Sequence, residues 1–177
     1  MSLVRFKATD LTRFLEAIDR NLEESAKITV IGGSAAALGY NVSSATSDID
    51  TFSSNLDKIR LAADAARRET GLEIPLSNTP IADVPYNYEE RLERVLPNLG
   101  KLQVWVLEKH DLALSKTIRA AQHDLQQLTE LHGVAPLDLT VLVARYQENG
   151  PRYWSTGSHS PSLLVRSGSP LGCVSCR

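Results

Sequence analysis

The sequence contains little cysteine, and neither sign of charge dominates it. Both cysteines, Cys173 and Cys176, lie in the last five of the 177 residues, so the sequence predicts no disulfide framework. The formal net charge is −2, from 19 basic and 21 acidic side chains. Proteins that grip nucleic-acid backbone usually carry a strong basic excess. Strong nonspecific DNA binding is therefore not expected, and Cys173-x-x-Cys176 is a weak metal or redox candidate.

Long apolar runs are also missing. No run approaches the roughly 20 apolar residues that cross a bilayer. The first residues, Met1 to Lys7, lack the apolar stretch of a signal peptide. With the scarcity of cysteine, these absences predict a cytoplasmic protein that makes no use of a membrane. The composition, 42% apolar and 23% charged, suits one compact domain.

Apolar periodicity and turn residues predict helices interleaved with short strands. Helical spacing indicates helices over 10–25, 55–70, 111–131 and 137–147, and β-forming residues indicate strands over 28–31, 48–52 and 102–106. This order predicts an α+β fold, close to α/β, with a mixed central sheet flanked by helices and a helical C-terminal part. We expect one domain over residues 1–150 and a flexible tail over 151–177, rich in Ser, Gly and Pro.

Asp48 and Asp50 are the first candidate site residues. In a strand, residues two apart point to the same side, and their Cα atoms lie roughly 6.6 Å apart. Two such carboxylates can converge on a pair of Mg²⁺ ions, whose spacing is about 3.5–4 Å. A bare Asp-x-Asp is more often only the polar face of a strand, so the surrounding sequence decides its meaning.

The surrounding sequence is a glycine turn between a strand and a helix. Gly32 and Gly33 follow the predicted strand over 28–31, and Ser34 opens an alanine-rich helix. Glycine lets backbone N–H groups approach a phosphate, and a helix N-terminus favours its negative charge. A Rossmann unit opens in a similar way, but its glycine pattern is not met here because residues 35–37 are all Ala.

These motifs together carry a resemblance. The glycine turn followed by Thr46-Ser47-Asp48-Ile49-Asp50 resembles the signature of the DNA-polymerase-β-like nucleotidyltransferase superfamily. The stretch from His110 to Lys116 resembles a helix of small bacterial members related to AbiEii-type toxins. In that group a helical Lys precedes an Asp by about eight residues, as Lys116 precedes Asp124 here. The resemblance covers roughly residues 25 to 132.

The resemblance implies metal-dependent transfer of a nucleotidyl group from a nucleoside triphosphate to a hydroxyl of an RNA such as tRNA, a protein or a small molecule. Asp48 and Asp50 would be catalytic and hold Mg²⁺ or Mn²⁺. Lys116 would be a cation near phosphate or a site carboxylate, and the triphosphate would lie on Gly32, Gly33 and Ser34. The resemblance also suggests a toxin–antitoxin or phage-defence setting, with a cognate toxin or antitoxin or a second copy of the chain as partner.

The sequence departs from the family pattern at two places. Many members carry an Arg shortly before the acidic pair, where this chain has Ser43-Ser44-Ala45. Active members usually have a third carboxylate on a later strand, and for this role we favour Asp83 over Glu73. The departures keep a second hypothesis open, a catalytically degenerate nucleotidyltransferase-fold module that acts as an antitoxin, sensor or scaffold.

Overall fold

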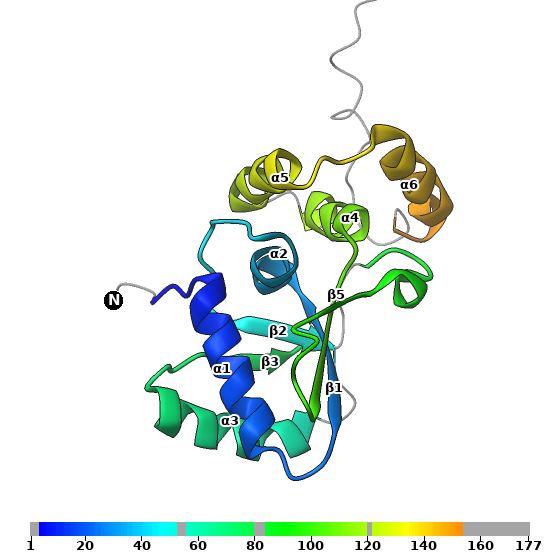
Figure 1. Cartoon of the computed structure of the whole chain (residues 1–177). Coiled ribbons are helices and arrows are strands. Elements are labelled where there is room, and N and C mark those ends of the chain that lie inside the picture. The colour runs from blue at the N-terminus through cyan, green and yellow to red at the C-terminus, as the bar shows by residue number, and fades with distance from the viewer. Residues whose placement is uncertain (1–3, 53–55, 80–83, 120–121, 154–177) are drawn as a thin grey trace, which may run out of the picture.

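The computed structural model describes residues 4–52, 56–79, 84–119 and 122–153. It confirms an α+β fold with a mixed sheet flanked by helices (Figure 1). The strands are β1 (Ala26–Ile31), β2 (Ile49–Phe52), β3 (Leu76–Asn78), β4 (Glu93–Val95) and β5 (Leu102–Val106). The helices are α1 (Ala8–Asn21), α2 (Gly32–Tyr40), α3 (Leu56–Thr70), α4 (Lys109–Arg119), α5 (Gln122–Val134) and α6 (Leu139–Tyr153), with a short 3-10 helix at Tyr88–Arg91.

The strands lie in the order β3-β2-β1-β5-β4 across the sheet. β1 runs parallel to β5 and antiparallel to β2, while β3 pairs in parallel with β2 and β4 antiparallel with β5. Because β1 and β2 are antiparallel, the last residue of β1 lies beside the start of β2, and Ile31 pairs with Asp50. This pairing places the glycine turn next to the acidic pair.

The helices form two groups around the sheet. α1 and α3 pack against each other on one side of the sheet, and α4, α5 and α6 gather beyond the end of β5 (Figure 1). α2 lies between this second group and the sheet, in contact with α4, α5, β1 and β2. Strands therefore contact α2 on one side and helices contact it on the other.

The core forms where the two central strands meet α1. Alternate residues of the strands are completely buried, and so is the apolar stripe of α1: Ile28, Val30, Val104 and Val106, with Leu11, Phe14, Leu15 and Ile18. Burying one such side chain contributes about 1.5–3 kcal/mol.

α1 begins at Ala8, before the predicted start. Asp10 is therefore its third residue, and its carboxylate accepts the N–H of Lys7 at 3.0 Å.

The single helix predicted over 111–131 is wrong, because the structure has two helices there, α4 and α5. The Lys116 ammonium hydrogen-bonds to the side chain of Gln127, eleven residues later. In one continuous helix these residues would be about 16 Å apart along the axis, too far for that contact. α5 packs on α4, and Leu125, within the predicted helix, is exposed.

The start of β2 and the end of α6 differ from the boundaries that the sequence predicted. β2 begins at Ile49, so Asp48 lies in a bend just before the strand. α6 runs to Tyr153, beyond the domain end expected at residue 150, and residues 154–177, with both cysteines, lie outside the described residues. Within the described ranges, no helix combines the length and apolarity needed to cross a membrane.

A substitution at Gly39 of α2 tests how closely this helix packs on the sheet. A Cβ at Gly39 would lie 2.9 Å from Cγ2 of the buried Val106, a branched side chain with little freedom to move. We expect Gly39→Ala to lower the free energy of unfolding by about 1–3 kcal/mol through overpacking. Gly133→Ala is the matched control in α5, where an added Cβ meets nothing within 4 Å. Urea unfolding should show Gly133→Ala equal to or above wild type, because alanine is the better helix former.

Candidate functional site

The Asp50 carboxylate lies beside Gly32, the first residue of the glycine turn. Gly32 has φ +67°, a left-handed conformation that favours glycine, and it leads from β1 straight into α2. A Cβ built on Gly32 would lie 3.6 Å from Asp50 Oδ2. The pairing of Ile31 with Asp50 explains this contact, since it puts the acid opposite the last residue before the turn. The structure therefore brings one predicted acid to the turn.

Two hydroxyls orient the other oxygen of Asp50. Ser77 Oγ donates to Asp50 Oδ1 at 2.5 Å, and Thr79 Oγ1 lies 3.5 Å from the same atom. Ser77 stands there because β3 pairs in parallel with β2 in a register that sets it opposite Asp50. Hydroxyls hold a carboxylate in place without cancelling its charge. Sequence reasoning missed both residues, because the register of β3 is not visible in the chain.

Asp48 reaches the turn through Thr46. Thr46 Oγ1 lies 3.2 Å from Asp48 O and 3.4 Å from Asp48 Oδ1. The same hydroxyl lies 3.2 Å from the position that a Cβ on Gly33 would take. Asp50 thus lies beside the first glycine of the turn, and Asp48 is joined to the second through one threonine.

Lys116 is connected to the turn through Gln127. Its side chain is 2% exposed, and its Nζ lies 3.4 Å from Oδ1 of the buried Asp124 and hydrogen-bonds to Gln127 Oε1. Gln127 Nε2 in turn lies 3.2 Å from the Cβ position of Gly33. The spacing of Lys116 and Asp124 thus corresponds to a buried ion pair, and the lysine faces protein groups.

Comparison with protein families bears on this geometry. The family described as "Nucleotidyltransferase of unknown function (DUF6036)" matches residues 7–166, which include the turn, both acids and Lys116. The chain belongs to this nucleotidyltransferase family. No curated protein and no solved structure gave a significant match.

Two other residues predicted for the site, Ser34 and Asp83, lie apart from these contacts or outside the described residues. Ser34 is buried and its hydroxyl donates to Ile31 O at 3.0 Å, so that hydrogen is used within the turn. Asp83 lies outside the described residues, and Glu73 is an exposed residue before β3. Among the described residues, no three His, Cys, Asp or Glu side chains form a group that could hold a metal. Within the described residues, the site contains the carboxylates of Asp48 and Asp50.

The loop that leads to Asp48 and Asp50 is hydrogen-bonded to α5. Glu130 Oε2 accepts the Ser44 N–H at 3.0 Å and the Ser44 hydroxyl at 2.6 Å. Ser43 donates to the same oxygen at 3.2 Å. Ser43 and Ser44 therefore attach this stretch to α5, and the attachment holds Thr46 and Asp48 near the turn.

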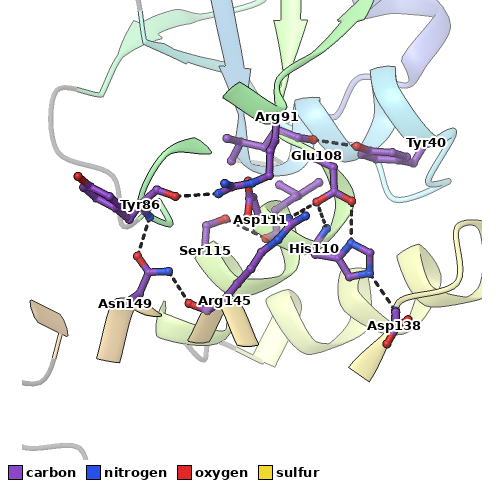
Figure 2. Close-up of polar contacts among 12 residues, drawn as sticks. Tyr40, Tyr86, Arg91, Glu108, His110, Asp111, Ser115, Asp138, Arg145 and Asn149 are labelled. Atoms are coloured by element: carbon purple, nitrogen blue, oxygen red, sulfur yellow. Dashed lines mark hydrogen bonds and ion pairs between the residues drawn. The ribbon is translucent and has the colours of Figure 1, made fainter. Parts of the chain in front are cut away.

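A second group of charged side chains lies at the start of α4 (Figure 2). Asp111 is completely buried, and its two oxygens accept from Arg91 Nε and Arg145 Nη1, each at 2.8 Å. Arg145 of α6 also pairs with Glu108. Two guanidinium groups therefore face two carboxylates. This balance is typical of a structural network, which here fastens α4, the helix that carries Lys116, to α6.

His110 completes that network as a hydrogen-bond bridge. Its Nε2 accepts the N–H of Asp138 at 2.9 Å, so the proton of the neutral ring is on Nδ1, which lies 2.6 Å from Glu108 Oε1 (Figure 2). The bridge joins the beginning of α4 to the turn before α6. It gives α4 a defined position relative to α6.

Asp111→Asn tests the network. The change leaves two partly buried arginines short of one negative charge, and breaking a buried pair costs about 3–5 kcal/mol. We expect a loss of that order in the free energy of unfolding, measured by urea titration. Asp57→Asn is the control, because the side chain of Asp57 is 96% exposed beside Arg60 and its loss should leave stability unchanged. Equal stability of the two variants would contradict a structural role for Asp111.

Glu108 gives the network a defined pH dependence. Burial raises the pKa of Glu108, but hydrogen bonds from Arg145 and His110 outweigh it, and the pKa lies below its ordinary value of 4.5. A depressed pKa means that the stabilisation is complete above pH 4.5 and is lost as the pH falls through the folded-state value. We expect Glu108→Gln to flatten the fall in unfolding free energy below that pH. An unchanged acid limb would show that Glu108 does not contribute.

Proposed function

We propose that the chain transfers a nucleotidyl group from a nucleoside triphosphate to a hydroxyl acceptor. The observation that carries the proposal is the meeting of Asp50 and Asp48 with the glycine turn at Gly32 and Gly33. The turn opens α2, whose first N–H groups and positive dipole end favour a phosphate. Membership of a nucleotidyltransferase family supports the same reaction class.

A divalent cation fits the donor set at this turn. The hydrogen bonds of Asp50 come from the hydroxyls of Ser77 and Thr79, which carry no charge, so a bound cation would supply the counter-charge for this carboxylate. Carboxylate oxygens are the ligands that Mg²⁺ and Mn²⁺ take. Asp48 and Asp50 would hold the ion, with Asp83 as our candidate for a third carboxylate. When bound, the ion neutralises phosphate charge and orients the reacting oxygens.

The proposed transfer is a single displacement at phosphorus. The acceptor oxygen forms a bond to the α-phosphorus while the bond from that phosphorus to the bridging oxygen breaks in line. Pyrophosphate leaves with the bonding electron pair, and the proton of the hydroxyl passes to solvent water. The chain contributes binding and orientation: the glycine turn lets phosphate oxygens approach the backbone, and the two acids stand at the same turn.

The acceptor is an RNA, a protein or a small molecule with a free hydroxyl. Incubation with each labelled nucleoside triphosphate, Mg²⁺ or Mn²⁺, and either tRNA or a cell extract will show which molecule becomes labelled. The resemblance of α4 to a helix of AbiEii-type toxins is the basis for proposing a toxin–antitoxin or phage-defence setting. In that setting a cognate protein partner is expected, and co-purification from the native host tests it.

A nucleotidyltransferase-fold binding module is the second candidate. It is favoured by the stretch Ser43-Ser44-Ala45, which stands where the family resemblance implies an Arg. Calorimetry with each triphosphate and Mg²⁺ separates the two functions at the binding step. Absence of binding for every triphosphate would favour the module, whereas binding with turnover would establish the enzyme.

Asp48→Asn and Asp50→Asn test the enzymatic proposal. Each change removes a charge that the cation requires, and we expect transfer to fall by more than about 100-fold. The exposed Asp57→Asn should retain wild-type transfer and serves as the matched control. Thermal unfolding of all three variants checks that the fold survives. Full transfer by a folded Asp48 or Asp50 variant would exclude this metal role.

A further inference from the structure

Gln127 is the residue of α5 that reaches the glycine turn. Its side chain is 8% exposed, and its Nε2 lies 3.2 Å from the position of a Cβ on Gly33. A Cβ at Gly33 would make a tight contact with this amide, which would have to shift by a few tenths of an ångström. No motif in the sequence marks this residue, which comes to the turn through the change of direction between α4 and α5.

Lys116 determines which way the amide of Gln127 faces. An ammonium group has donors and no acceptor, so the atom that it contacts must be the amide oxygen, Oε1. The amide nitrogen then points to the opposite side, toward Gly33. The pairing of Lys116 with Asp124 holds the lysine in place, and so the orientation of the amide is not free to invert.

The other side-chain donors at the turn face acceptors of the protein. The Ser34 hydroxyl donates to Ile31 O, and the Thr46 hydroxyl lies against Asp48 O. Lys116 faces Asp124 and Gln127. Among the residues that the structure describes, none accepts a hydrogen bond from Gln127 Nε2. A phosphate oxygen requires donors, and this nearly buried amide is a side-chain N–H group at the turn that can supply one.

We propose that Gln127 binds the nucleotide by donating from Nε2 to a phosphate oxygen held at Gly33. The inference rests on the proposed function, because it assigns a contact within the same site. Lys116 then has a different role from the phosphate contact that the sequence predicted. Its ammonium orients the amide of Gln127, and the amide donates to the ligand. Phosphate recognition at the turn then combines the backbone N–H groups of α2 with one neutral side-chain donor.

The test compares Gln127→Glu with Gln126→Glu in the full-length chain. Gln126 is the exposed neighbour on the same helix, so both variants add one negative charge to α5. A glutamate at position 127 can still accept from Lys116, but it presents a carboxylate to the phosphate in place of a donor. We expect calorimetric affinity for ATP and for inorganic tripolyphosphate, each with Mg²⁺, to fall about tenfold or more in Gln127→Glu. Gln126→Glu should stay near wild type.

The remaining outcomes separate this contact from the site itself. If wild type binds neither ATP nor tripolyphosphate, the proposed function fails and the contact fails with it. If wild type binds and Gln127→Glu binds equally well, only the role of Gln127 is overturned. A loss for ATP with unchanged tripolyphosphate affinity would also overturn it. Gln127→Met, similar in volume and without a donor, repeats the measurement should the glutamate variant unfold, with the same expected loss.

Discussion

The pairing register of β1 and β2 is the constraint on which the site depends. Ile31 pairs with Asp50, and Val30 pairs with Thr51, which is completely buried. A slip of one residue would exchange the two faces of β2 and carry the Asp50 carboxylate into the position of Thr51. Burial of Ile49 and Thr51 therefore determines where the acid points. The position of the polar site is a consequence of packing in the core.

Helix α4 connects that site with the C-terminal helices through buried charges. Asp111 near its start is paired with arginines from the 3-10 helix and α6, and Lys116 farther along is paired with Asp124 of α5. Burying a charge is costly unless an opposite charge compensates it, so an arrangement that separates these partners is strongly disfavoured. The pairs thereby specify how α4, α5 and α6 sit against α2, and they bring Gln127 to the turn.

Much of the fold and part of the candidate site could be predicted from the sequence. The glycine turn, the acidic pair and the spacing of Lys116 and Asp124 are local patterns, and local geometry is enough to recognise them. Ser77, Thr79 and Gln127 could not be found in this way. Ser77 depends on the register of a three-residue strand, and Gln127 depends on the packing of α5 on α4, which apolar periodicity did not reveal. Strong helical spacing over 111–131 even suggested a continuous helix.

The sequence by itself determined the alternation of helices and strands, the turn that glycine permits, and the nucleotidyltransferase resemblance, because each arises from neighbouring residues and the stereochemistry of the backbone. Tertiary structure alone decided which hydroxyls orient Asp50, which amide meets Gly33 and where the lysine faces. Asp50 and Ser77 are 27 positions apart, Gly33 and Gln127 are 94 apart, and Lys116 and Gln127 are 11 apart. Only the competition for burial in the folded core brings such residues together.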